Sequence, residues 1–266
     1  MSGAITSIAV EETATSELME KLLEAADIIV NDFPFALWET LYATILATFF
    51  AIVIGLPLGM LLVAGDSKGI YPLPPVLMKV VNVVINLLRS VPFTILMVTV
   101  IPLTRLIVGT PVGTVASIVP LVIAAFPFVA RLVEGSLREV NPNIIETAQS
   151  MGATPMQIML HVMIPESVPS LISNFTLAIT TIMGYTAMSG TVGGGGIGMI
   201  AYTHGYLRYK AFVMYAAVIV LVIITQVMQS FGSWLARKCD KRLKKCYESP
   251  CGVSALHGLF EYGRNR

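Results

Sequence analysis

The chain has 266 residues, of which 55% are hydrophobic and only 12% are charged. Soluble domains carry about 25% charged residues, so this composition excludes an ordinary soluble enzyme and predicts a membrane protein. The formal net charge of +1 gives no basic field of the kind that attracts nucleic acid, and no nucleic-acid partner is expected. The three cysteines all lie near the C-terminus, which is not a disulfide framework and suits a reducing compartment.

The N-terminal segment, residues 1–35, is polar and acidic and contains one amphipathic stretch. Between Ser16 and Val30, apolar side chains share one helical face and charged side chains share the other. Such a helix is too charged to span a bilayer, and we expect it to lie along the membrane surface or against the first span. The segment lacks a basic start followed by an apolar core, so no cleavable signal peptide is predicted.

Five charge-poor stretches follow, and each is long enough to cross a hydrocarbon core, which takes about twenty apolar residues. They predict an all-α membrane domain with five transmembrane helices over residues 36–236. The predicted spans lie at about 40–64, 80–104, 106–130, 168–189 and 211–236. Gly55, Pro57 and Gly59 in the first span permit kinks and close helix contacts.

Two further segments complete the predicted organisation. Residues 191–202 are rich in glycine and are expected to form a re-entrant or surface stretch. Residues 237–266 form a basic tail, which we expect to anchor the last span to anionic membrane lipid.

The distribution of lysine and arginine predicts the orientation in the membrane. With five spans, the two ends of the chain lie on opposite sides. A cytoplasmic C-terminus leaves twelve lysines and arginines on the inner side and four on the outer side, as the positive-inside rule requires. We therefore expect an outer, periplasmic N-terminus, and a cytoplasmic loop between the third and fourth spans.

That loop, residues 134–169, contains start and stop signals for two short helices. An Asn-Pro pair at 141–142 provides a helix cap and a first helical residue, and a Thr-Pro pair at 154–155 repeats the signal. Gly152, between the two starts, suits a left-handed turn. Pro165 is expected to end the second helix. An ordinary amphipathic linker between two spans is the alternative interpretation.

The same loop resembles the E-A-A-x3-G-x9-I-x-L-P motif of the permease subunits of bacterial ABC importers. The matching positions, all at the motif's spacing, are Glu146, Thr147, Ala148, Gly152, Val162, Ile164 and Pro165. Three of them depart from the motif by small or apolar exchanges, and Ala153, Thr154 and Pro155 follow the glycine. The resemblance implies the type I ABC importer permease fold, with a coupling helix in this loop that docks on a separate ATPase.

Beyond the loop, the resemblance covers about residues 38–234 and is nearest to the permeases of methionine importers. The runs GLPLGMLL, RSVPFTILMV and GYTAMSGTVGGGGIG carry it. It implies a homodimer of five-span subunits in the bacterial inner membrane, two copies of an ABC ATPase that hold ATP and Mg, and a periplasmic methionine-binding lipoprotein. The chain itself is then expected to bind no cofactor or metal and to be a transport subunit, not an enzyme.

The resemblance also implies the residues of a substrate path. Met188 matches the methionine that closes the pathway at the dimer axis, and Tyr185 and Ser189 flank it. Arg89 and Ser90 lie at an expected kink near the path. Two alternatives stay open: Met188 as a core methionine that fills a gap, and Arg89 as a structural arginine that bonds a carbonyl or reaches the membrane surface.

Several absences narrow the chemistry. The glycines at 193–196 are not followed by Lys-Ser or Lys-Thr, so they form no Walker A motif; if ATP drives this protein, another chain binds it. The predicted spans contain no Asp or Glu, which argues against a proton- or sodium-coupled carrier. The three cysteines and His257 have spacings that match no zinc knuckle.

The resemblance implies ATP-driven import, with D- and L-methionine as the substrate. The alternatives are a permease for another small amino acid or related solute, an ATP-independent secondary carrier, and a channel.

Overall fold

The computed structural model describes residues 19, 22–66 and 69–239. Every regular element of these described residues is helical, which confirms the all-α fold. In chain order the elements are α2 (Phe33–Ala64), α3 (Pro75–Ser90), α4 (Phe93–Val108), α5 (Thr114–Arg138), α6 (Pro142–Ser150), α7 (Pro155–Gln157), the π-helical η1 (Ile158–Met163), α8 (Ile164–Ser189), the 3-10 turn η2 (Gly190–Val192), α9 (Gly196–Ile200), the π-helical η3 (Ala201–Leu207) and α10 (Ala211–Cys239).

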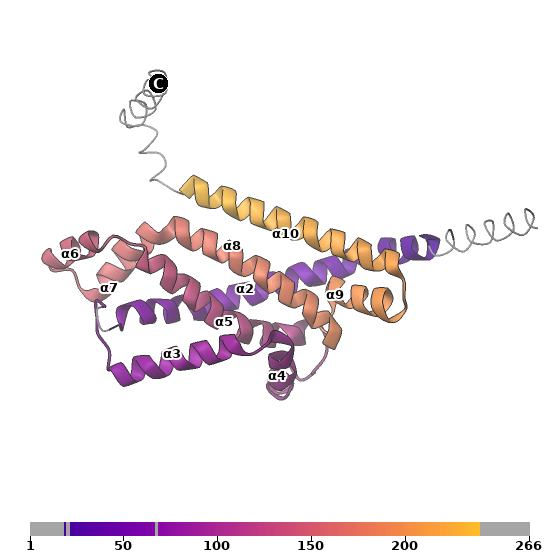
Figure 1. The fold of residues 1–266 in the computed structure, drawn as a ribbon, viewed down its shortest axis with the longest axis horizontal. Helices are drawn as coiled ribbons and strands as arrows, with labels where there is room; N and C mark the ends of the chain where they lie inside the picture. The colour runs from indigo at the N-terminus through magenta and orange to yellow at the C-terminus, as the bar shows by residue number, and fades with distance from the viewer. Residues whose placement is uncertain (1–18, 20–21, 67–68, 240–266) are drawn as a thin grey trace, which may run out of the picture.

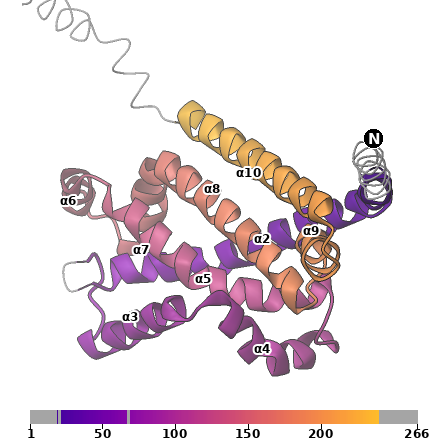
Figure 2. The same cartoon turned by 45° about the vertical axis from the view of Figure 1, so that its right-hand side comes forward.

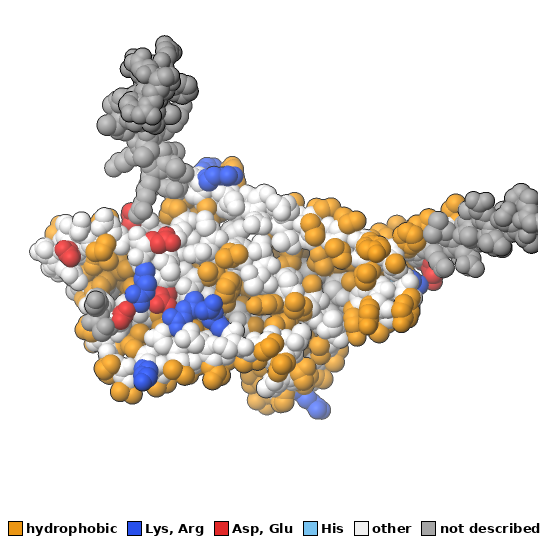
Figure 3. Space-filling view, viewed as in Figure 1, with side chains coloured by type: hydrophobic (Ala, Val, Ile, Leu, Met, Phe, Trp, Pro, Cys, Tyr) orange, Lys and Arg blue, Asp and Glu red, His pale blue; other side chains and the backbone are white. Residues whose placement is uncertain are grey.

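The long helices lie side by side and give the molecule two distinct ends. Figures 1 and 2 show α2, α5, α8 and α10 running along one another, with α6 and α7 at one end and α9 at the other. Charged side chains gather toward the α6 end in Figure 3, while much of the remaining visible surface is apolar. An apolar band that ends in a charged zone is what a bilayer requires of a spanning bundle.

Four described helical segments are long and apolar enough to cross a membrane: Phe33–Ala64, Thr114–Arg138, Pro155–Val192 and Ala211–Cys239. The pair α3 and α4 meets the same test when taken together, but the two helices are bent by 109°. Counting this pair as one span gives five, in agreement with the sequence.

The second span predicted at 80–104 is therefore two helices, and the bend lies where a kink was expected, at Arg89 and Ser90. Val91 and Pro92 adopt extended backbone angles between α3 and α4. The cause is local, because a proline disfavours helical angles in the residue before it and supplies no N–H of its own. The predicted start of the third span at 106 is wrong: α4 continues to Val108, where Gly109 with φ 86° ends it, and α5 begins at Thr114.

Pro165 does not end a helix, contrary to the expectation from the sequence. The helical path continues from Pro155 to Val192 and Pro165 lies in the first turn of α8. The π-turn η1 explains this, because Ile164 N–H donates to the carbonyl of Met159, five residues back. Where the bonding pattern changes register, a proline is tolerated as it is at a helix start.

Among the described residues, the most extensive contact between two helices is that of α2 with α5. Small residues line the contact face of α2, where Ala43, Ala47 and Ala51 are buried. Gly55 and Gly59 continue that face, and a Cβ on either glycine would come within 2.9 Å of α5 atoms. This confirms the predicted close contact at these glycines, because only small residues let two backbones approach in a membrane.

Part of the predicted amphipathic N-terminal segment lies within the described residues. Residues 22–31 are helical. Ala25 and Ile28 are buried in a cluster with Val213 and Ala217 of α10, and Glu24 pairs with Lys210 at 2.7 Å. The segment therefore packs against the start of α10. The tail from residue 240 onward, with two of its cysteines and His257, lies outside the described residues.

Candidate functional site: the inner loop and the helix face that leads from it

The loop between α5 and α8 has the local geometry that its sequence predicts. The Asn141 side chain accepts a hydrogen bond from the Asn143 backbone N–H at 3.0 Å, so it caps α6. Thr154 and Gln157 form a reciprocal capping box at the start of α7. Gly152 has φ 78°, the left-handed value that favours glycine. The caps and the glycine together set the angle between the two short helices.

The residues of the coupling motif divide into two groups. Ala148, Ala153, Val162 and Ile164 are partly buried and pack against the main hydrophobic core of the bundle. Glu146, Thr154 and Pro155 are exposed. The backbone N–H of Ala153 donates to the carbonyl of Ala148 across the glycine turn at 3.2 Å. The apolar motif positions therefore hold the loop on the bundle, and the polar ones face outward.

Large apolar side chains are also exposed on this loop. Of the nine residues of α6, none is buried. Met151 is 83% exposed and Met156 67% exposed, and Ile144 and Leu160 are exposed as well. Flexible methionines and aliphatic side chains grouped on a polar loop are typical of a surface that another protein covers.

Behind the loop, a network of charged and amide groups joins α5 to α3, and sequence analysis did not find it. The Arg131 guanidinium donates to Glu134 at 2.6 Å, to Asn82 at 2.7 Å and to Asn86 at 3.0 Å. Arg138 pairs with Glu134 at 3.0 Å and with Asp66 at 2.9 Å. The contacts to α3 and Asp66 join residues 45 or more positions apart, so no local pattern reveals them.

One face of α8 runs from the loop toward the other end of the molecule and stays open. The opposite face is buried in the bundle through Leu171, Ala178 and Ile182. The open face follows the helical spacing of three and four residues. Ser173, Leu177, Gly184 and Met188 are exposed on it, and Ser170 and Thr181 are partly buried at its edges. Met188 is 50% exposed, so it lies on this face and is not a buried core methionine.

The structure places the predicted path residues other than Met188 in different surroundings. The Tyr185 ring stacks on Phe93 with ring centroids 4.7 Å apart, and Phe93 is the first residue of α4, just beyond the bend. Arg89 and Ser90 are exposed at the end of α3, and the Ser90 hydroxyl donates to its own helix. Ser189 is buried, with its carbonyl accepting the Gly194 N–H at 2.9 Å. The four residues therefore have different surroundings around one bend.

At the α9 end, Glu39 holds the glycine-rich segment, and sequence analysis did not identify this role. The Glu39 carboxylate accepts the Gly196 N–H at 2.9 Å and the Thr114 hydroxyl at 2.8 Å. The Thr40 hydroxyl accepts the Ile197 N–H at 2.9 Å. α2 begins at Phe33, earlier than the predicted span, and so brings a carboxylate to the end of the bundle. An acceptor at a helix start stabilises its free N–H groups.

Among the described ranges 19, 22–66 and 69–239, no three His, Cys, Asp or Glu side chains are grouped as metal ligands would be. The groups that the structure gathers are instead a capped loop, an open polar helix face and two hydrogen-bonded frames. These features suit a protein that binds partners and moves a solute.

The comparison with protein families agrees with this geometry. Residues 55–245 match the family described as binding-protein-dependent transport system inner membrane component. The chain belongs to this family and is a permease subunit of an ABC importer in the inner membrane. The matched range includes the α5–α8 loop and the open face of α8.

Several similar proteins are described as permeases of D-methionine transport systems. The chain is 45% identical to the probable D-methionine transport system permease protein MetI of Vibrio cholerae over 207 residues, which covers 78% of this chain and 92% of the relative. It is 46% identical to the D-methionine transport system permease protein MetI of Escherichia coli strain K12 over 153 residues, covering 58% and 70%.

Solved structures give the same result. A chain of the MetNI methionine ABC transporter, solved in inward-facing conformations, is 44% identical, covers 77% of this chain and 94% of its own length, and superposes with a TM-score of 0.75. A chain of an amino acid ABC transporter solved with histidines has a TM-score of 0.65 at 17% identity, and so supports the fold alone.

Proposed function

We propose that this permease imports methionine, in both its L- and D-forms. The observation that carries the proposal is the similarity to methionine permeases over most of both chains, by sequence and by fold. The runs that carry the sequence resemblance lie on α2, at the bend between α3 and α4, and from the end of α8 into the glycine-rich segment.

The assembly that we propose is a homodimer with two copies of an ABC ATPase and a periplasmic methionine-binding lipoprotein. ATP and Mg are bound by the ATPase, and this chain contributes no catalytic group. The exposed apolar side chains of the α6–α7 loop support a partner at this place. In this arrangement the loop and the C-terminus lie in the cytoplasm and the N-terminus lies outside.

The proposed coupling mechanism follows from the unbroken helical path beyond Pro155. At about 1.5 Å rise per residue, the path from Pro155 to Met188 spans about 50 Å. A movement of α7, imposed by the ATPase through Glu146 and the motif residues near Gly152, therefore reaches Met188 as a rigid-body motion. The π-turn η1 belongs to this path and joins α7 to α8 without a break.

Met188 is proposed as the gate, with Tyr185 and Ser189 setting its position. Tyr185 is fixed by stacking on Phe93 and Ser189 by its backbone bond to Gly194. The Met188 side chain itself is half exposed, which leaves it free to meet its counterpart in a second copy. Arg89 and Ser90 lie at the bend that borders this region.

The proposal is tested by reconstituting the permease in vesicles with its ATPase and binding protein. Uptake of labelled L-methionine and D-methionine should require ATP and should compete with unlabelled methionine. Selective uptake of a different solute would contradict the methionine assignment. Uptake that persists without the ATPase and stops on adding an uncoupler would indicate a secondary carrier instead.

A further inference from the structure

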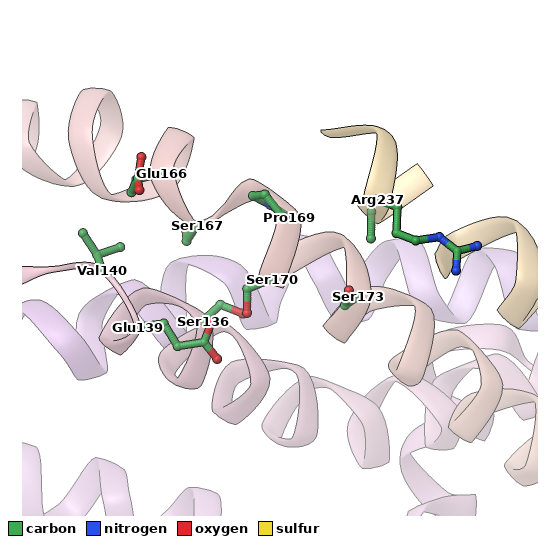
Figure 4. A pocket seen from close by; sticks show the side chains of 10 residues that line it. Ser136, Glu139, Val140, Glu166, Ser167, Pro169, Ser170, Ser173 and Arg237 are labelled. Carbon is green, nitrogen blue, oxygen red and sulfur yellow. The ribbon is translucent and has the colours of Figure 1, made fainter. Parts of the chain in front are cut away.

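A cavity of about 340 Å³ lies between the inner ends of three helices, and no role has been assigned to it above. It is formed by the end of α5, the first turns of α8 and the end of α10, close to the coupling loop (Figure 4). Its polar lining residues are Ser136, Glu139, Glu166, Ser167, Ser170, Ser173 and Arg237. The volume is in the range of sites for small molecules, about 300–1,000 Å³.

The lining combines three kinds of chemistry. Glu139 and Glu166 bring carboxylates from α5 and α8, and Arg237 brings a guanidinium from α10. Val140, Pro169 and Ala236 supply an apolar wall. A ligand that matches all of these has a cationic group, an anionic group and an apolar part.

The serine side of the cavity is ordered by hydrogen bonds between helices. The Ser170 hydroxyl donates to the Ser136 hydroxyl oxygen at 3.2 Å. The Asn174 amide donates to the same oxygen at 2.8 Å. Ser136 is fully buried. These contacts fix the spacing of α5 and α8 at the cavity, so the site is formed before any ligand arrives.

The cavity also lies in line with Met188. Ser170 and Ser173 line the cavity and belong to the open face of α8 that carries Met188. Glu166 is one turn before Ser170 on that face. At about 1.5 Å per residue, Ser170 and Met188 are about 27 Å apart along the helix, so the cavity lies at the inner end of a continuous strip.

We propose that this cavity is a release site for a zwitterionic amino acid on the cytoplasmic side of the gate. Glu139 and Glu166 hold the α-ammonium group, Arg237 holds the α-carboxylate, and the apolar wall accepts the side chain. This inference rests on the proposed function and specifies where the solute is held after it passes Met188.

Other ligand classes fit the cavity less well. An anionic lipid headgroup would place its phosphate beside two carboxylates, and like charges at short range are unfavourable. A polyamine would place an ammonium group beside the Arg237 guanidinium, which is unfavourable for the same reason. A zwitterion satisfies both signs, and charge-assisted hydrogen bonds are stronger than neutral ones.

Thiol protection tests the site directly in the assembled complex. In one variant Ser170→Cys is introduced with all three native cysteines changed to serine, and a small water-soluble thiol reagent labels it. The matched control keeps only the native Cys239, which is at the end of α10 and does not line the cavity. Methionine at about ten times its Kd should slow labelling of the Ser170→Cys thiol about tenfold and leave the Cys239 thiol unaffected.

Analogues that lack one charged group show which contacts matter. Methionine methyl ester lacks the carboxylate and 4-(methylthio)butanoate lacks the ammonium group, so both should protect more weakly than methionine. Arg237→Gln should weaken protection by methionine and abolish the difference between methionine and its ester. Glu139→Gln should weaken protection by methionine and abolish the difference between methionine and the analogue that lacks the ammonium group. Ser173→Cys provides a second reporter if the first variant does not assemble.

The outcomes separate this inference from the proposed function. Unchanged labelling of both reporters, in a complex that imports methionine, would overturn the release site and leave the function standing. If the complex imports a different amino acid, the methionine assignment fails, and that amino acid must protect the thiol instead. Failure of the imported solute to protect either reporter would overturn the site.

Discussion

The two ends of the molecule are built in opposite ways. At the α9 end, the glycine-rich segment is held by Glu39, Thr40 and Thr114 and by backbone bonds to neighbouring turns. At the α6 end, the coupling loop leaves Met151 and Met156 exposed, and it packs against the bundle through Ala148, Ala153, Val162 and Ile164. The first end is held by hydrogen bonds within one chain, while the second presents exposed apolar side chains that a partner can cover.

The close packing at the α9 end explains why it needs glycines. A Cβ on Gly190 would collide with the backbone of Gly198 and Met199, and a Cβ on Gly198 would collide with the backbone of Ala187. Gly152 differs, because no atom lies within 4 Å of an added Cβ and only its positive φ restricts it. At the α9 end glycine therefore lets two backbone segments approach closely, and at the α6 end it allows a left-handed turn.

The largest effect is expected from Gly198→Val. Its side chain would displace backbone that has no room to move, so the α9 end should not form and the protein should fail to accumulate. The measurement is the yield and thermal unfolding of the purified permease. Gly135→Ala in α5 is the control, since its Cβ meets nothing within 4 Å and helical alanine is favoured over glycine by up to about 1 kcal/mol. A normal yield of Gly198→Val would show that the α9 end does not need a glycine at this position.

A smaller loss is expected from Glu39→Ala. The change removes the acceptor of the Gly196 N–H and of the Thr114 hydroxyl, and each buried group left unpaired costs about 1–3 kcal/mol. The thermal midpoint should fall, and amide exchange should increase first in α9. Glu39→Gln keeps one acceptor oxygen and should lose less. Equal midpoints for wild type and Glu39→Ala would show that the clamp contributes no stability.

The smallest effect is a pH dependence at the same end. Burial lowers the pKa of His204, and the nearby Arg208 and Lys210 lower it further, while Asp32 and Glu24 oppose this. The unfolded chain binds a proton at about pH 6.5, before the folded protein does, so stability should fall as the pH drops below this value. His204→Gln should have a flatter profile of thermal midpoint against pH. Identical profiles would remove His204 as a source of the dependence.

The sequence predicted most of what depends on neighbouring residues. The caps at Asn141 and Thr154 and the left-handed Gly152 are confirmed, because each depends on groups only a few positions away. The apolar stretches also located the membrane helices, since length and hydrophobicity are enough for that. Their ends were less accurate, as the early start of α2 at Phe33 shows.

The sequence did not predict what depends on distant residues or on competing local signals. Glu39 meets Gly196 across 157 positions, and Arg131 meets Asn82 across 49. A proline such as Pro165 normally ends a helix. Here the preceding π-turn shifts the bonding register, so the helix continues through it. The cavity at the inner end needed three helices to be placed together before its lining could be recognised.

The central claim is that the α6–α7 loop couples this permease to its ATPase, and Gly152→Val tests it most directly. A non-glycine residue at positive φ costs about 1–3 kcal/mol of local strain, which should tilt α7 and leave the spans intact. Gly109→Val is the matched control, because Gly109 has φ 86°, meets nothing within 4 Å and ends α4.

Both variants are reconstituted in vesicles with the ATPase and the binding protein, and ATP-driven methionine uptake is measured beside the dimer assembly and thermal midpoint. The account predicts that Gly152→Val assembles and loses uptake, while Gly109→Val shows a similar loss of thermal stability and retains uptake. Wild-type uptake by the Gly152→Val complex would contradict the account, because the loop would then be only a linker between two spans.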